Sequence, residues 1–278
     1  MEIKVNNLNF YYNKKSGIKI LDSINFKIPN NTIVGITGKS GSGKTTLAEL
    51  MCGINIPSSG KITVDDIVIN KKNIFDERKL KNKIGYIAQN SENQIFNKTV
   101  KDELTYALKF LDKSIDEDKI IEVLNFIGLN ESYLNKNPLL LSTGERKKLS
   151  IASTLVLNTD IIIFDDPTRG LDTKSVKNLK RLIKNLKSSF GKTIIIISRD
   201  VEFIHALSDE VIIMDKGKIL IWGNKYEVFK TTDVLKNYGL PIPKMMEFSS
   251  IVLDKKNIKI GYRDEINDLL KDIYRYVR

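Results

Sequence analysis

The stretch GKSGSGKTT at residues 38–46 constrains this chain more than any other feature of its sequence. It fits the pattern G-x-x-x-x-G-K-[ST], whose defined positions are Gly38, Gly43, Lys44 and Thr45. An apolar run at 32–37 precedes it and predicts a buried strand, and a helix-forming run at 46–51 follows. Such a loop directs backbone N–H groups and the positive end of a helix dipole toward phosphate oxygens. We therefore predict a nucleotide-binding loop, because a flexible Gly/Ser linker would not lie between two apolar elements.

Nine consecutive residues are predicted to hold the phosphates: Gly38, Lys39, Ser40, Gly41, Ser42, Gly43, Lys44, Thr45 and Thr46. The Lys44 ammonium should reach the outer phosphates, and the Thr45 hydroxyl should coordinate Mg²⁺. The motif by itself does not say what happens to the nucleotide.

The composition is that of a soluble globular protein, with 278 residues, 41% hydrophobic and 28% charged. No apolar run approaches the length that crosses a bilayer, and residues 1–5 do not begin a signal peptide. The single cysteine, Cys52, is predicted in the core. The single histidine, His205, is predicted on a helix surface, so no zinc or histidine-based cluster is expected.

The net charge of +11 is compatible with a nucleic-acid or membrane partner. The basic residues are spread along the sequence, however, without the interleaved aromatic residues that single-strand binders use. We therefore expect no nucleic-acid partner.

Hydrophobic periodicity divides the first half of the chain into strand-rich and helical parts. Residues 2–10 and 19–28 alternate and predict an antiparallel pair, and 61–69 predicts two short strands around Asp65 and Asp66. Residues 83–88 predict a strand that ends at Gln89. Helical periodicity begins at Thr99, and a second helix is expected over 116–127.

The second half carries polar residues at the ends of buried strands. Residues 161–164 predict a strand ending in Asp165 and Asp166, and 193–197 a strand followed by Arg199. The carboxyl ends of parallel strands are where such sheets bind ligands. Between the halves, Ser142 and Glu145 predict a capping box at the start of a helix. A helix is expected over 173–188 and a hairpin over 210–222.

The last part of the chain, from about Thr231, predicts a short extension. Pro241 and Pro243 mark a break, and residues 263–278 predict a helix with one apolar face. That face must pack on the body of the protein or on a partner.

Taken together, GKSGSGKTT, IGYIAQNSENQIF, LLLSTGER and IIIFDDPTRGLD, followed by IIIISRD, resemble an ATP-binding cassette (ABC) ATPase over residues 1–230. AQNSENQIFNKTV and the later GLPIPK are similar to the ATPases of energy-coupling factor importers, which take up vitamins and transition metals. The resemblance implies ATP and Mg²⁺ as ligands. It also implies a dimer that sandwiches two nucleotides, formed with a second, related ABC ATPase or as a homodimer.

The resemblance implies further roles for individual residues. Tyr12 would stack on adenine, and Asp165 would hold Mg²⁺. Gln89 would contact Mg²⁺ and the attacking water and couple to the membrane subunit. Asp172 would cross the dimer interface. The signature that closes over ATP on the opposite subunit would consist of Ser142, Thr143, Gly144 and Glu145.

Three positions depart from the family pattern. Asp166 stands where the family has a catalytic glutamate, Arg199 replaces a switch histidine, and Thr143 replaces the first signature glycine. The catalytic positions are those of Gln89, Asp166 and Arg199. Aspartate is one methylene shorter than glutamate, and a misplacement of about 1 Å can cost about a hundredfold in rate. Arginine stays protonated, so it does not accept a proton as neutral imidazole does. These changes favour tight ATP binding with slow hydrolysis.

We accordingly expect an α/β fold, a phosphate-loop NTPase with an antiparallel β flank. Residues 1–230 would form the ATP-binding domain, with a helical subdomain at about 92–158, and 231–278 an extension with a possible role in dimerisation. The expected function is the ATP-binding subunit of an energy-coupling factor importer. It would be peripheral on the cytoplasmic face of the membrane, with a transporter subunit and a substrate-binding subunit as membrane partners. The alternatives are a regulatory subunit that hydrolyses little ATP and a soluble ABC ATPase acting on nucleic acid.

Overall fold

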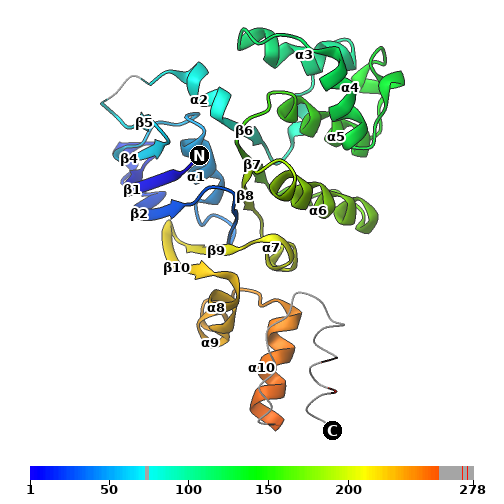
Figure 1. Ribbon diagram of the computed structural model, residues 1–278. Coiled ribbons are helices and arrows are strands. Elements are labelled where there is room, and N and C mark those ends of the chain that lie inside the picture. Colours follow the sequence, from blue (N-terminus) through cyan, green and yellow to red (C-terminus); the bar gives the residue numbers. More distant parts are fainter. Residues whose placement is uncertain (73–74, 257–270, 272–273, 275–278) are drawn as a thin grey trace.

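The computed structural model describes residues 1–72, 75–256, 271 and 274. The apolar helix expected over 263–278 lies outside the described residues, apart from the isolated positions 271 and 274. Two sheets, helices beside them and a helical extension at one end make up the described fold (Figure 1). Among the described residues, no helix is long and apolar enough to cross a membrane.

A six-stranded sheet forms the centre, in the order β10-β9-β3-β8-β7-β6. Its strands are β3 (Ile33–Gly38), β6 (Ile84–Ile87), β7 (Ile161–Asp165), β8 (Thr193–Ile197), β9 (Glu210–Asp215) and β10 (Lys218–Asn224). All neighbours pair in parallel except β9 and β10, which form the expected hairpin. The isoleucine-rich β3, β7 and β8 are buried along their whole length, as parallel strands covered on both faces must be.

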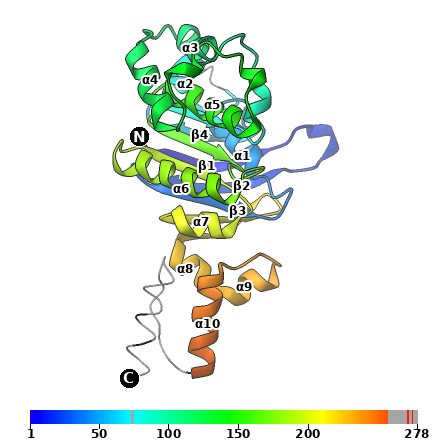
Figure 2. The ribbon, with the colours of Figure 1, turned by 90° about the vertical axis from the view of Figure 1, so that its right-hand side faces the viewer.

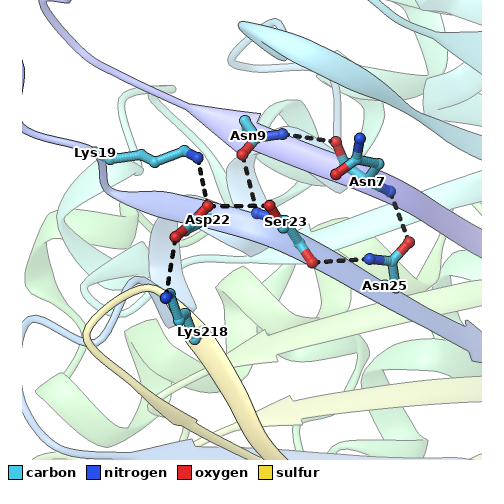
Figure 3. A network of polar contacts seen from close by, with 7 residues as sticks. All are labelled: Asn7, Asn9, Lys19, Asp22, Ser23, Asn25 and Lys218. Atoms are coloured by element: carbon cyan, nitrogen blue, oxygen red, sulfur yellow. Dashed lines mark hydrogen bonds and ion pairs between the residues drawn. The ribbon is translucent and has the colours of Figure 1, made fainter.

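A four-stranded antiparallel sheet has the order β2-β1-β4-β5. It consists of β1 (Ile3–Phe10), β2 (Leu21–Ile28), β4 (Ser59–Val64) and β5 (Ile67–Ile69), which confirms the predicted pairing of the first two strands. The register between β1 and β2 shifts twice, and Asn7 and Ser23 have positive φ there. In Figure 3 the Asn9 side chain accepts a hydrogen bond from the Ser23 N–H, and the Asn25 side chain accepts one from the Asn7 N–H. Asparagine side chains thus supply hydrogen bonds where the backbone ladder between the two strands is interrupted.

Some helices lie beside the two sheets, and others form the two opposite ends of the molecule (Figure 1). They are α1 (Lys44–Met51), α2 (Glu77–Lys83), α3 (Val100–Phe110), α4 (Glu117–Phe126), α5 (Thr143–Leu155), α6 (Thr173–Ser188), α7 (Val201–Leu207), α8 (Lys225–Lys230), α9 (Thr232–Asn237) and α10 (Lys244–Lys256). α3, α4 and α5 gather beyond β6, and α8, α9 and α10 lie at the opposite end (Figures 1 and 2).

Two hydrophobic cores lie on the two faces of the central sheet. Alternate residues of one strand point to opposite faces, so Ile162 and Ile194 join the core beneath α3–α7. Their neighbours Ile161 and Ile195 join the core that contains α1 and the antiparallel sheet. The central sheet is therefore packed against a hydrophobic core on each face, which fixes the position of the edge where its parallel strands end.

Two side chains differ from their predicted environment. His205 is not on a helix surface: it is 3% exposed, and its ring lies 5.7 Å from that of Phe229. The prediction is wrong because α7 packs on β3 and α6 and is covered by α8 as well. Cys52 packs against the core, as expected, but it is only half-buried.

Candidate nucleotide-binding site

The phosphate loop joins the end of β3 to the start of α1. The Lys44 ammonium donates to the Gly38 carbonyl at 2.9 Å, the Lys39 carbonyl at 2.7 Å and the Ser42 hydroxyl at 3.0 Å. Burial lowers the pKa of Lys44, while the charges of Asp166 and Asp165 oppose that shift. The cation is thus held inside the loop, at the point where phosphate charge would be compensated.

Two glycines are required by close approaches of the backbone. Gly38 has φ 146°, and a Cβ there would lie 2.0 Å from the Met214 carbonyl oxygen at the end of β9. Gly43 has φ 96°, and a Cβ there would meet the Leu21 side chain at 2.7 Å. Neither position has room for a side chain, so the loop is packed tightly between β9 and β2.

A cavity of about 480 Å³ opens beside this loop. Its lining residues come from the loop and from the ends of β6, β7 and β8: Tyr12, Ile20, Ser40, Gly41, Ser42, Gly43, Lys44, Thr45, Thr46, Gln89, Asp165, Asp166, Arg169, Ile197 and Arg199. Parallel strands end at one edge of the sheet, which is why segments distant in sequence converge here.

Two carboxylates at the carboxyl end of β7 line this cavity. Asp165 is 2% exposed and accepts a hydrogen bond from the Tyr86 hydroxyl at 3.1 Å. Burial raises the pKa of Asp165, and hydrogen bonds from Thr45 and Tyr86 partly offset that effect. Asp166 accepts from the Gln89 amide at 3.3 Å. Carboxylate, hydroxyl and amide oxygens are ligands suited to Mg²⁺, so Asp165, Thr45 and Gln89 fit the expected metal.

Tyr12 stands at the mouth of the cavity, on the segment after β1. Its side chain is 63% exposed, and its ring packs edge-on against Phe10 with 4.9 Å between centroids. Its hydroxyl lies 3.0 Å from that of Thr46 and donates to Glu49 at 3.2 Å. The phenol is therefore fixed beside the loop with an aromatic face in solvent.

The signature residues lie at the start of α5, away from this cavity. Ser142 accepts from the Glu145 N–H at 3.3 Å, and Glu145 accepts from the Ser142 N–H at 2.9 Å, which confirms the predicted capping box. Thr143 and Gly144 are exposed. Asp172 is the exposed N-cap of α6 and accepts from the Ser175 N–H at 2.6 Å. Neither the signature residues nor Asp172 are among the described residues that line the cavity. They therefore lie outside the nucleotide cavity of this chain.

Sequence reasoning missed Tyr86, Arg169, Ile20 and Ile197 as members of the site. Tyr86 lies in the predicted strand before Gln89, but only the parallel pairing of β6 with β7 brings it to Asp165. Arg169 lies three residues after Asp166, and its N–H donates to the Asp166 carbonyl at 3.2 Å. Its place in a tight turn could have suggested that it reaches the same cavity.

This fold and site define a phosphate-loop nucleotide-binding protein, and comparison with known proteins identifies the family. The family model described as "ABC transporter" matches residues 21–169. An energy-coupling factor transporter ATP-binding protein EcfA2 of Clostridium tetani is 33% identical, with 88% of this chain and 86% of that protein covered.

Two solved structures resemble the fold. CbiO1 of Clostridium perfringens, described as part of the ABC transporter complex CbiONQ, has a TM-score of 0.71 and 30% identity, with 89% of this chain and 98% of that chain covered. The ATP-binding cassette MJ0796, described as dimeric and bound to ADP and Pi, has a TM-score of 0.71 and 27% identity, with 80% of this chain and 98% of that chain covered. The chain therefore belongs to the ABC transporter family and, within it, to the energy-coupling factor transporter ATP-binding proteins.

Proposed function

We propose that this chain binds ATP with Mg²⁺ and uses its binding and hydrolysis to drive uptake through membrane partner subunits. The observation that carries the proposal is one cavity in which Lys44, Asp165, Asp166 and Gln89 meet. The transported substrate would be a vitamin or a transition-metal ion, selected by a substrate-binding membrane subunit. The chain would lie peripherally on the cytoplasmic face of the membrane and have no nucleic-acid partner.

Within the site, each residue would act on the phosphates or on water. The N–H groups of the loop and the Lys44 ammonium would hold the β- and γ-phosphates. Asp165, Thr45 and Gln89 would hold Mg²⁺, which when bound neutralises phosphate charge. Asp166 would accept a proton from water, and Arg199 would pair with a phosphate oxygen. Tyr12 would stack on adenine.

The proposed ATPase pairs with a second ABC ATPase or with its own copy. The exposed positions of Ser142 and Asp172 support this arrangement, because neither residue is among the described residues that line the cavity of this chain. The relative MJ0796 is dimeric. We propose residues 1–230 as the ATP-binding domain, 92–158 as its helical subdomain and 231–278 as the extension.

A second cavity supports docking of a membrane subunit. This coupling groove, of about 520 Å³, lies between β6, α3 and α5, and it includes Cys52, Gln94, Phe96, Glu103, Tyr106 and Phe110 in its lining. Phe96 is 63% exposed and packs edge-on against Tyr106, which is 50% exposed. Gln89 lines the ATP cavity and Gln94 lines the groove, so one short segment joins the two sites.

A second candidate function is a regulatory subunit that binds ATP but hydrolyses little of it. Asp166 and Arg199 favour it, since both depart from the family pattern and both line the nucleotide cavity. The partner ATPase would then supply the competent site.

The proposal is tested by ATP binding to the Lys44→Ala variant. Three hydrogen bonds hold the ammonium in the loop, so its loss should reduce binding below detection in calorimetry. Lys109→Ala changes an exposed lysine of α3 and serves as the control. Unchanged ATP binding by a folded Lys44→Ala protein would refute the site.

A further inference from the structure

Arg169 adds a basic side chain to the nucleotide cavity. It is exposed and is among the described residues that line the cavity, as are Lys44 and Arg199. The carboxylates in the same lining are those of Asp165 and Asp166. Three basic side chains and two carboxylates therefore belong to the described lining, and this excess of positive charge favours an anionic ligand.

Hydrogen bonds hold the backbone of Arg169 from both sides. Its N–H donates to the Asp166 carbonyl at 3.2 Å, and its carbonyl accepts from the Lys147 ammonium at 2.9 Å. The Leu171 N–H donates to the Thr168 carbonyl at 3.1 Å, which closes the same turn a second time. The base of the Arg169 side chain is therefore fixed close to Asp166, and only the side chain itself remains free to turn.

The cation that holds this turn is buried. Lys147 belongs to α5 and is 4% exposed. Burial lowers its pKa, and the charges of Glu92 and then Asp166 oppose that shift. An apolar side chain would pack α5 without the cost of burying a charge, so the ammonium indicates that the turn itself has to be held. Lys147 thus ties α5 to the turn that carries Arg169.

An arginine in an exposed turn is commonly a solvated surface residue. Two observations point to a ligand for Arg169 instead. Its side chain lines the nucleotide cavity, and within the part of the chain that the structure describes no carboxylate forms an ion pair with it. Its turn also begins at Asp166, whose carboxylate accepts from the Gln89 amide. The guanidinium therefore enters the cavity from the segment that would act on the outermost phosphate.

We propose that the Arg169 guanidinium binds the γ-phosphate of ATP, and that Lys147 is a positioning residue that holds Arg169 through its carbonyl. The inference rests on the proposed function, in which Asp166 accepts a proton from water beside that phosphate. A guanidinium offers paired N–H donors that match two oxygens of one phosphate. Arg169 then distinguishes ATP from ADP, because ADP lacks the γ-phosphate.

The test measures the Kd of ATP and of ADP, each with Mg²⁺, by calorimetry. A salt concentration of about 0.15 M largely screens exposed charges more than about 8 Å apart. Arg169→Gln should raise the Kd for ATP about tenfold, as loss of a hydrogen bond between charged groups does, and leave the Kd for ADP unchanged. Arg169→Lys should recover part of the loss, since it keeps the charge without the paired donors. Arg181→Gln, which changes an exposed arginine of α6, is the control and should alter neither Kd.

Lys147→Met tests the positioning role, because methionine cannot donate to the Arg169 carbonyl. The Kd for ATP should rise severalfold, again without a change for ADP. In the Arg169→Gln background the same substitution should add nothing, because the side chain that Lys147 positions is absent. Lys147→Gln keeps an N–H donor and should weaken ATP binding less. If Lys147→Met does not fold, Lys147→Gln is compared in the same two backgrounds.

Equal Kd values for ATP in the wild type and in Arg169→Gln would overturn the inference. A loss shared by ATP and ADP would do so too, because it would assign Arg169 to another phosphate. A purely structural role of Lys147 would change both Kd values together and persist in the Arg169→Gln background, which would overturn the positioning role. Failure of the wild-type chain to bind ATP would instead refute the proposed function.

Discussion

At the scale of single residues, Asp166 decides how the proposed catalytic site works. Its φ is 44°, a region that aspartate adopts more readily than glutamate. Its N–H donates to the Ile197 carbonyl at 2.8 Å, and its carboxylate is held by Gln89. The backbone is thus fixed between β7 and β8, and the aspartate side chain is one methylene shorter than the glutamate of the family pattern. Arg199, from the end of β8, adds a permanent positive charge to the same cavity.

The double substitution Asp166→Glu with Arg199→His should raise the maximal ATPase rate about tenfold or more. Glutamate extends toward the water, and histidine removes a charge that stabilises bound ATP as much as its transition state. ATP affinity should fall slightly, and the strained φ should lower Tm by a few degrees. Steady-state assays of the wild type, both single variants and the double variant test this, alone and with the partner ATPase. A double variant no faster than the wild type would contradict an impaired site.

At the scale of elements, the start of α5 depends on one carboxylate. Hydrogen bonds from Ser142 and then from Tyr133 lower the pKa of Glu145 from 4.5 to about 2. A lowered carboxyl pKa stabilises the fold above the unfolded-state pKa, and this contribution is lost as the pH falls through the folded-state pKa. The capping box therefore weakens between about pH 4.5 and pH 2. Because Glu145 is near the surface, its contribution is less than about 1 kcal/mol.

Glu145→Gln should lower stability at pH 7, and the difference from the wild type should narrow as the pH falls below 4.5. Urea unfolding at about pH 7, 4 and 3 measures this difference in unfolding free energy, because the last two values lie within the window between the two pKa values. Glu131→Gln, which changes an exposed glutamate before α5, is the control. If the unfolding free energies of the wild type and Glu145→Gln differ by the same amount at every pH, the charge of Glu145 does not stabilise the capping box.

At the scale of the whole molecule, the first part of the C-terminal extension packs against the rest of the protein. Leu240 and Met246 are buried in the core, and the Lys244 N–H donates to Glu202 of α7 at 2.7 Å. Removing residues 240–278 would expose that core, so a test of dimerisation needs a later boundary. On α10, Phe248 and Ile251 are 43% and 46% exposed and lie three residues apart on one face.

Removal of residues 257–278, or Phe248→Ala with Ile251→Ala, should weaken dimer formation and leave ATP binding of the monomer unchanged. Apolar side chains exposed on α10 would gain stability if a partner covered them. Sedimentation with ATP measures the dimer, and Val234→Ala, an exposed residue of α9, is the control. Normal dimers from both altered chains would exclude a role for the extension.

The coupling groove allows a sharper test than charge reversal of its acidic residues. Three acidic residues after Gln89 could pair with basic residues of a membrane subunit or form a solvated charged face: Glu92, Asp102 and Glu103. Of these, Glu103 is among the described residues that line the groove. In the structure, Glu103 accepts from the N–H groups of Phe96 and Asn97 at 3.3 and 3.1 Å, so reversing its charge would disrupt the groove itself.

Phe96→Ala with Tyr106→Ala should instead reduce co-purification with the membrane subunit severalfold, because both aromatic side chains line the groove. ATP binding should not change. Phe190→Ala is the matched control, since Phe190 is 51% exposed and does not line the groove. Full co-purification of the double variant would exclude this groove as the docking site.

The sequence alone determined the features that depend on neighbours along the chain. The phosphate loop, the isoleucine-rich strands, the capping box and the hairpin each follow from residue types a few positions apart. The polar ends of β7 and β8 also predicted where a ligand site would form. These signals are strong because hydrogen bonding and side-chain periodicity within one element are local.

Only the tertiary structure decided which distant surfaces meet. α8 packs against α7 through Tyr226 and Phe229, which helps to bury His205. The β6–β7 pairing brings Tyr86 to Asp165. Periodicity reports which face of an element is apolar but not which element covers it, because that choice depends on packing across the whole chain.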